Sequence, residues 1–345
     1  MRIALDATYS LGNALSGVGV YSRELLNGLA ASDFADGWDW FYRSQRYWRG
    51  RLQSRPSNVR VCRLSGSKGD RSAALFHGLN QRLPELRFPR QVATFHDLFV
   101  LSGDYSTAEF RARFAAQARE AAAAADLIIA VSAFTGSQVE NYLNVPASRI
   151  RVIHHGVTPR VVPGPARDIA REKIILCVGA IQRRKNQIGL VRAFRAAPPD
   201  WTLVLAGSEG YEAEAALREI ANSPIIDRIK ITGYVPDEEI ARLYARASIF
   251  AFPSLDEGFG MPALEAMAAG VPVIAGNRSS LPEVCGDAAL LVDPASDEEL
   301  ANAIGLLAGD EDLRQKMAAD GQAHARKFRW EDAVQKTIAV YRELV

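Results

Sequence analysis

Short runs of consecutive apolar residues alternate along the chain with segments whose apolar residues recur at helical spacing. In the first half, these runs predict strands at 2–6, 59–64, 91–95, 127–131 and 151–153, with helices at 19–29 and 106–125. In the second half, strands are predicted at 174–178, 202–206, 229–232, 249–252, 271–274 and 289–292, followed by an amphipathic helix at 330–344. Apolar strands that alternate with helices are typical of parallel sheets covered by helices on both faces.

A segment rich in proline and glycine separates the two halves. Residues 158–171 contain Pro159, Pro163, Gly164 and Pro165, a composition that indicates a linker. A length of 345 residues is comfortable for two domains. The pattern therefore predicts an α/β protein of two Rossmann-like domains, with parallel sheets facing a central cleft.

Composition narrows the class of protein. The apolar and charged fractions are those of an ordinary globular chain, and a net charge of +1 argues against nucleic acid as a partner. Three scattered cysteines indicate a reducing compartment without a disulfide framework or a zinc site. Asp6 interrupts any signal-peptide pattern, and the longest apolar stretch, 121–131, is too short to cross a bilayer. We expect a cytoplasmic protein.

The most informative segment is 247–270, where a buried strand leads through an acidic, glycine-containing loop into a helix. Pro262 fits the first helical turn, and Glu265 is expected in the same turn. Free N–H groups at a helix start favour phosphate, while a carboxylate there can accept hydrogen bonds from a ribose diol. Gly258 and Gly260 allow the backbone to approach a ligand closely. Together with Glu257 on the loop, the arrangement suits a nucleotide sugar.

The run from Glu257 to Glu265, Glu-Gly-Phe-Gly-Met-Pro-Ala-Leu-Glu, resembles the Glu-x7-Glu motif of retaining glycosyltransferases of family 4, which have the GT-B fold. The resemblance implies a catalytic role for Glu257. It implies donor binding by Gly258, Phe259, Gly260, Met261 and Glu265. The plainer interpretation is that one glutamate is a helix-start carboxylate and the other a solvated loop charge.

Three cations follow the first strand of the second half. Arg183, Arg184 and Lys185 lie where strand passes into helix, and cations there stabilise the charge that grows on a departing diphosphate. Each charge-assisted hydrogen bond contributes ~1.5–3 kcal/mol. The sequence resembles the family's Arg-Lys-Asn loop, which implies catalytic roles for Arg184 and Lys185 and donor binding by Arg183. Which arginine reaches the diphosphate is left open, because Ala180 stands where some relatives have arginine.

Two further loops carry candidate residues in the first half. Gly17 and Gly19 lie ahead of a predicted helix, where glycines let phosphate approach the amides; a flexible loop is the alternative. His96 follows a strand, at the edge where α/β proteins bind ligands, and its ring can hydrogen-bond a sugar hydroxyl; the alternative is a packing histidine. The family has a glycine-rich loop and a His-Asp pair at these places. The resemblance therefore implies donor binding by the glycines and a catalytic role for His96.

Tyr234 and Val235 lie at a strand end in the second half. In the family the equivalent backbone flanks the nucleobase, which implies donor binding here, and a turn that packs a helix start at Asp237 is equally compatible. Asp310 and Asp312 spell an Asp-x-Asp pattern, but they follow Gly309 and precede an amphipathic run. They predict a helix start and no metal site.

Residues 40–68 contain eight cations and no acidic residue, and they are mixed with aromatic residues: Trp40, Phe41, Tyr42, Tyr47 and Trp48. A basic, aromatic surface suits an anionic membrane or a lipid-diphosphate acceptor. A polyanion site, or a solvated face with a few buried aromatic residues, would have the same composition.

The resemblance covers nearly the whole chain and implies a retaining hexosyltransferase. It implies no cofactor and no metal, since Arg184 and Lys185 supply positive charge. It suggests GDP-mannose as donor and a lipid-linked saccharide as acceptor, at the inner face of the cytoplasmic membrane. The expected domains are an acceptor-side domain at 1–160, a nucleotide-sugar domain at 161–326, and a helix at 327–345 that returns to the first domain. A nucleotide-sugar epimerase and a non-catalytic sugar-nucleotide-binding protein are the alternatives.

Overall fold

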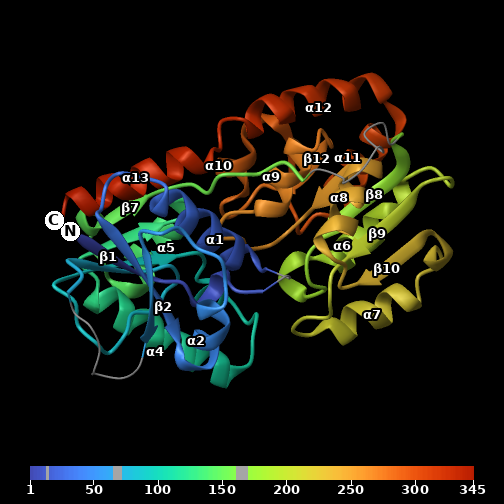
Figure 1. Ribbon diagram of the computed structural model, residues 1–345. Helices are drawn as coiled ribbons and strands as arrows, with labels where there is room; N and C mark the ends of the chain where they lie inside the picture. Colours follow the sequence, from blue (N-terminus) through green and yellow to red (C-terminus); the bar gives the residue numbers. More distant parts are fainter. Residues whose placement is uncertain (13–14, 65–71, 161–169) are drawn as a thin grey trace. The chain divides into compact units, whose positions relative to one another are not determined.

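The computed structural model describes residues 1–12, 15–64, 72–160 and 170–345, which form two compact units (Figure 1). Unit 1 contains Met1–Gly156 and Arg329–Val345, and unit 2 contains Val157–Phe328. The chain therefore leaves unit 1, builds unit 2, and returns to unit 1. Much of the expected linker, 161–169, lies outside the described residues.

Unit 1 is built on a parallel sheet with the strand order β3-β2-β1-β4-β5-β6-β7. Its strands are β1 (Arg2–Asp6), β2 (Gly37–Arg43), β3 (Val59–Leu64), β4 (Leu75–Gly78), β5 (Arg90–Phe95), β6 (Leu127–Ala130) and β7 (Ile150–Val152). Its helices are α1 (Gly17–Ala30), α2 (Ser44–Arg51), α3 (Phe99–Ser102), α4 (Ala108–Ala124), α5 (Ala133–Leu143) and α13 (Trp330–Arg342).

Unit 2 is a second parallel sheet, with the order β10-β9-β8-β11-β12-β13. Its strands are β8 (Glu172–Val178), β9 (Thr202–Ala206), β10 (Ile229–Gly233), β11 (Ala247–Phe252), β12 (Val273–Gly276) and β13 (Ala289–Val292). Its helices are α6 (Gln187–Ala193), α7 (Ala213–Ala221), α8 (Asp237–Arg246), α9 (Met261–Ala268), α10 (Leu281–Cys285), α11 (Asp297–Gly309) and α12 (Glu311–Ala325). The chain order reverses between the neighbours β8 and β11, where ligands of open α/β sheets bind. The doubly wound α/β fold predicted from the sequence is confirmed.

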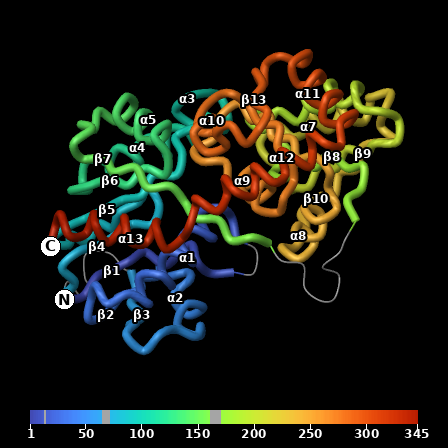
Figure 2. The backbone as a smooth tube through the Cα atoms, turned by 90° about the horizontal axis from the view of Figure 1, so that it is seen from above, coloured from blue at the N-terminus to red at the C-terminus, as the bar shows by residue number. Residues whose placement is uncertain are grey.

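Helix α13 packs against α1, and Figure 2 shows both ends of the chain in unit 1. A buried row of hydrogen bonds ties this helix to the sheet. The Tyr341 hydroxyl lies 2.6 Å from His77 Nδ1, and His77 Nε2 lies 2.8 Å from Thr94 Oγ1. Thr94 Oγ1 also lies 2.9 Å from the Tyr21 hydroxyl on α1. Because the row joins α13, β4, β5 and α1, α13 is part of the core of unit 1.

Strand β2 corrects the prediction of a continuous basic, aromatic surface. Trp40, Phe41 and Tyr42 are buried between β1 and β3, so they are core residues and not surface ones. The sequence pattern concealed this strand because Asp39 lies in its middle. That carboxylate is buried between Arg2 at 2.6 Å and Arg60 at 2.8 Å, which satisfies its charge. Lys68 lies outside the described residues.

The exposed remainder of that segment is α2 and the turn after it. Trp48 is 68% exposed and Leu52 is 86% exposed, which is unusual for such large apolar side chains. Arg49, Arg51 and Arg55 are exposed beside them. Among the described helices, none has the length and apolar character needed to cross a bilayer.

Candidate active site

The basic loop of unit 2 is shaped by the turn that follows β8. Arg183–Lys185 form a single 3-10 turn, and Asn186 then adopts a left-handed conformation with φ of 55°. Asparagine tolerates that conformation, and its side chain caps α6 by accepting from the Gly189 N–H. The Leu255 N–H donates to the Arg184 carbonyl at 2.8 Å, which ties this turn to the loop after β11.

Three charged side chains meet where β8 and β11 end. Lys185 Nζ lies 2.5 Å from Glu257 Oε1, and an Arg184 guanidinium nitrogen lies 3.0 Å from Glu257 Oε2. All three side chains are about nine-tenths buried. Burial alone would raise the pKa of Glu257, but the two cations outweigh it and lower that pKa to about 2. Glu257 is therefore ionised at neutral pH. Burial lowers the pKa of Lys185, and the Glu257 carboxylate opposes that shift.

The Glu257 loop is fixed by its backbone. The Ser279 hydroxyl accepts from the Glu257 N–H at 3.1 Å, and the Ser280 hydroxyl donates to the Glu257 carbonyl at 2.8 Å. Gly260 has φ of 98°, and a Cβ there would lie 2.5 Å from Leu281 Cδ2, so glycine is required. Phe259 is buried and lies edge-on to Phe328. Glu257 is thus a buried, preorganised carboxylate, and the interpretation as a solvated loop charge is wrong.

Glu265 is the fifth residue of α9, which begins at Met261, so it lies beyond the first turn where it was expected. One of its oxygens lies 2.8 Å from the Arg160 guanidinium, and the other accepts from the Tyr244 hydroxyl at 3.2 Å. Arg160 also lies 3.0 Å from Asp237. Arg160 and Tyr244 were not predicted as site residues, because an arginine in a proline-rich segment and a tyrosine on an apolar helix face carry no signal of a site.

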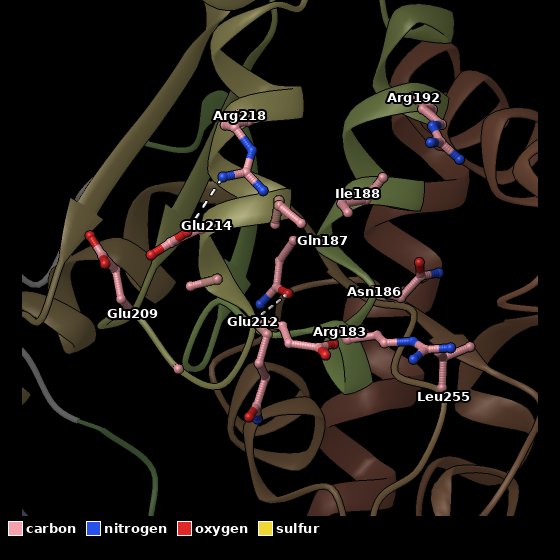
Figure 3. Close-up of a pocket in the computed structure, with 15 residues that line it drawn as sticks. Arg183, Asn186, Gln187, Ile188, Arg192, Glu209, Glu212, Glu214, Arg218 and Leu255 are labelled. Atoms are coloured by element: carbon pink, nitrogen blue, oxygen red, sulfur yellow. Dashed lines mark hydrogen bonds and ion pairs between the residues drawn. The ribbon is translucent and has the colours of Figure 1, made fainter. Parts of the chain in front are cut away.

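The structure separates the three cations of the basic loop. Arg184 and Lys185 contact Glu257, whereas Arg183 is exposed and lies in the wall of a pocket between α6 and α7, near Leu255 (Figure 3). Other residues of this wall include Gln187, Glu209, Glu212 and Arg218. The geometry brings Arg184 and Lys185 to the carboxylate and leaves Arg183 outside that cluster.

In unit 1, His96 lies just beyond β5 and is buried. Its Nε2 lies 3.0 Å from the Leu79 carbonyl, which can only accept, so Nε2 carries the proton and Nδ1 is an acceptor. Burial lowers the pKa of His96 to about 4, so the ring is neutral near pH 7. Tyr21 packs edge-on against it at a ring distance of 4.7 Å, and His155 stacks on it at 5.4 Å. His96 is a packed histidine whose orientation and tautomer are both defined.

Two glycines predicted to precede the first helix lie inside it. Gly17 is the first residue of α1 and Gly19 the third, and Ser16 caps the helix by accepting from the Gly19 N–H. A Cβ on Gly19 would lie 3.0 Å from the Tyr9 carbonyl, so the protein itself fills the space beside it, while a Cβ on Gly17 would have no atom of the described residues within 4 Å. Of this pair, only Gly17 has room beside it for a ligand.

The loop after β10 is open. Tyr234 is 62% exposed and Val235 is half-buried, and α8 begins at Asp237, as the turn suggested. Asp310 caps α12, whose first residue is Glu311, so the helix start predicted for the Asp-x-Asp pattern is confirmed.

Comparison with known proteins identifies the family. The family model described as glycosyl transferases group 1 matches residues 166–324, and the model of glycosyltransferase family 4 matches residues 70–161. The O-antigen chain mannosyltransferase B of Escherichia coli is 34% identical over 284 residues, which are 78% of this chain and 74% of that protein. The chain belongs to glycosyltransferase family 4.

Other relatives of this glycosyltransferase are matched over a smaller share of their length. The D-inositol 3-phosphate glycosyltransferase of a Nocardioides species is 31% identical over 64% of this chain and 54% of that protein. The serotype-specific mannosyltransferase WbdA of Escherichia coli is 27% identical over 74% of this chain and 34% of that protein. The relatives thus include enzymes named for mannosyl transfer and others named for a different acceptor.

Solved structures assign the GT-B fold to the glycosyltransferase. Sucrose-phosphate synthase from Thermosynechococcus elongatus has a TM-score of 0.78 at 24% identity, with 100% of this chain and 99% of that chain covered. WaaG, a glycosyltransferase involved in lipopolysaccharide biosynthesis, has a TM-score of 0.71 at 15% identity, with 99% of each chain covered. The GT-B fold implied by the resemblance is confirmed.

Proposed function

We propose that this glycosyltransferase transfers a hexose from a nucleoside diphosphate sugar to a saccharide hydroxyl with retention of configuration. The cluster of Arg184, Lys185 and Glu257 carries the proposal. It presents two buried cations at the strand ends where α/β proteins bind phosphate groups, and cations held in a dry site stabilise a departing diphosphate strongly.

Each residue has a role in this scheme. Arg184 and Lys185 hold the diphosphate, and Glu257 orients both cations and approaches the donor sugar. Glu265 accepts hydrogen bonds from the ribose, while the backbone around Tyr234 and Val235 flanks the base. In unit 1, neutral His96 offers Nδ1 as an acceptor for a sugar hydroxyl. The bond between C1 and the phosphate oxygen breaks, the acceptor oxygen bonds C1 on the same face, and its proton passes to the departing phosphate.

We propose GDP-mannose as the donor and a lipid-linked glycan as the acceptor. The support comes from the printed names of the O-antigen and serotype-specific mannosyltransferases among the relatives. The exposed arginines beside Trp48 and Leu52, on α2 and the turn after it, support the proposal that the enzyme acts at an anionic membrane surface. Because Arg184 and Lys185 supply the positive charge, we propose that turnover needs no metal ion.

Donor screening tests the proposal. Purified protein is incubated with GDP-mannose, UDP-glucose, UDP-N-acetylglucosamine or dTDP-rhamnose, with and without a short mannoside acceptor, and nucleotide release and product configuration are followed by NMR. We expect acceptor-dependent release of GDP, an α-linked product, and equal rates in EDTA. Conversion of the donor without acceptor would instead indicate an epimerase, and binding without turnover a non-catalytic protein.

A further inference from the structure

Arg160 connects the two acidic groups at one end of the predicted donor site. One guanidinium nitrogen lies 2.8 Å from Glu265 Oε1, and the other lies 3.0 Å from an oxygen of Asp237. The Glu265 side chain is 10% exposed and that of Arg160 is 23% exposed, so the pair is largely withdrawn from water. The proposed function gives Glu265 the ribose and the loop before Asp237 the base, so Arg160 spans these two recognition elements.

Tyr244 supports the same carboxylate from the other side. Its single hydroxyl proton is shared between two acceptors, Glu265 Oε2 at 3.2 Å and the Pro262 carbonyl at 3.1 Å. Burial and the nearby Glu265 keep the pKa of Tyr244 well above its ordinary value, so the hydroxyl remains a donor. Each carboxylate oxygen of Glu265 therefore receives one described hydrogen bond.

Lone-pair counting shows what the carboxylate can still bind. An ionised carboxylate has about four acceptor positions, two on each oxygen. Among the described residues, Arg160 uses one on Oε1 and Tyr244 uses one on Oε2. One acceptor position remains on each oxygen, and two adjacent acceptors match the two hydroxyls of a vicinal diol.

Charge indicates that Arg160 stays in place when a donor binds. Arg184 and Lys185 pair with Glu257, whereas Arg160 is the cation that pairs with Glu265 and Asp237 among the described residues. Ribose hydroxyls are neutral and cannot replace the cation, and removing one partner of a buried ion pair leaves the other charge uncompensated at a large cost. Because free acceptor positions exist, the ribose has no need to displace the guanidinium.

We propose that Arg160 is a positioning residue of the donor site, which together with Tyr244 orients Glu265 so that both carboxylate oxygens face the ribose diol. This inference rests on the proposed function, because it requires a nucleoside diphosphate ligand. It assigns to Arg160, which lies between β7 and β8, a part in recognising the ribose.

The experiment measures ribose discrimination by calorimetry. GDP, UDP and ADP are titrated into the full chain, and the tightest binder is compared with its 2′-deoxy form. The variants are Arg160→Met, Arg160→Lys and the matched control Arg242→Met, which removes an exposed arginine that pairs with Glu238 on α8. Circular dichroism and thermal unfolding verify that every variant folds.

In the parent, the ribonucleotide should bind about tenfold more tightly than the deoxynucleotide, as expected for a hydrogen bond to a charged acceptor. Arg160→Met should weaken ribonucleotide binding and reduce the preference to about twofold or less, whereas Arg242→Met should retain it. Arg160→Lys keeps the charge without the forked geometry and should lose part of the preference.

Four results overturn the inference. If Arg160→Met binds the ribonucleotide more tightly than the parent, Arg160 competes with the ligand. If Arg160→Met keeps the full preference, or if the parent has no preference, Glu265 does not depend on Arg160 for ribose recognition. Under either outcome the proposal that the protein is a glycosyltransferase still holds. If the parent binds none of the three nucleotides, the proposed function falls together with the inference.

Discussion

Arg183, Arg184 and Lys185 are adjacent in sequence but have different surroundings. Arg184 and Lys185 are buried against Glu257, whereas Arg183 is exposed. A cation held in place before the reaction can stabilise growing charge without reorganising, and an exposed, hydrated one contributes much less. The surroundings of each side chain therefore decide which of the three can act on the leaving group.

We predict that Lys185→Ala and Arg184→Ala lower kcat by about 100-fold or more, with a smaller rise in KM, because leaving-group charge is greatest in the transition state. Arg183→Ala is the matched control and should retain kcat within about threefold, since that side chain does not contact Glu257. Steady-state kinetics with the donor found by screening make the measurement. Equal losses in all three variants would show that the loop acts as a diffuse positive charge.

Sequence reasoning found residues whose chemistry is local and missed those whose role depends on the fold. Glu257 and Lys185 were recognisable because each lies in a distinctive motif. His77 was not, because a single histidine in an apolar run gives no sign that it will meet Tyr341, 264 residues further along the chain. Arg160 was missed for the same reason, since its partner Glu265 is 105 residues away.

Within residues 40–68, helix α2 and the turn after it carry the exposed apolar side chains, whereas strand β2 buries its own. The aromatic residues of β2 are core, but Trp48 and Leu52 remain at the surface next to exposed arginines. Arg51 also lies over the Trp48 ring at 5.7 Å, an arrangement that suits a membrane interface. The hypothesis of membrane contact thus narrows from residues 40–68 to this helix and its following turn.

Replacing both Trp48 and Leu52 with Ser should reduce binding to anionic liposomes at low salt by about tenfold or more, because both insert apolar surface and the nearby arginines add attraction. Turnover on a short, soluble acceptor should be retained. Leu306→Ser, on α11 of unit 2, is the control, because Leu306 is also exposed. Liposome flotation measures binding, and undiminished flotation of the double variant would mean that α2 is an ordinary solvated helix.

One buried hydrogen bond links α13 to strand β4. Tyr341→Phe removes the partner of His77 Nδ1 and should lower the free energy of unfolding by about 1–3 kcal/mol, the cost of leaving a buried polar atom unsatisfied. Tyr142→Phe is the control, because Tyr142 is 41% exposed and its loss should change stability by less than about 0.5 kcal/mol. Urea unfolding gives both values. A loss no larger than that of the control would show that packing alone holds α13.

On the scale of the whole molecule, titrating groups are divided between the two units. Burial lowers the pKa of His77 to about 3 and of His96 to about 4, and it also lowers the pKa of His155; all three lie in unit 1. In the unfolded chain these histidines have the ordinary pKa of about 6.5. As the pH falls, the unfolded chain therefore binds protons before the folded chain does. Unit 1 therefore loses stability between about pH 6.5 and pH 4, by about 3 kcal/mol from His96 alone.

Unit 2 should lose stability in a lower pH range than unit 1. Glu257 has its pKa lowered from 4.5 to about 2, so its stabilisation is present above about pH 4.5 and disappears as the pH falls towards 2. We predict that, after correction for the intrinsic exchange rate, hydrogen exchange in peptides of unit 1 is faster at pH 5 than at pH 7, whereas that of β8 and β11 hardly changes. His96→Asn should make the effect in unit 1 smaller. A uniform rise across both units would contradict this assignment.

The overall architecture was accessible from the sequence because apolar strands of parallel sheets repeat with little ambiguity, and β3, β9 and β13 have the predicted bounds. Strands β2 and β4 were missed, since each contains a buried polar residue that breaks the apolar run: Asp39 in one and His77 in the other. A sequence pattern does not reveal such strands, because the buried polar side chain is stabilised by hydrogen-bond or ion-pair partners that lie far away in the sequence.

The return of the chain to unit 1 at Arg329 has a consequence for biosynthesis. A ribosome makes β1 to β7 first, and then the whole of unit 2, before α13 exists. Until that helix emerges, the side of α1 that α13 contacts stays uncovered and His77 lacks its Tyr341 partner. Unit 2, continuous in sequence, can fold during translation, whereas the unit begun earlier is completed later. The order in which the two units can be completed thus runs opposite to the order in which their synthesis begins.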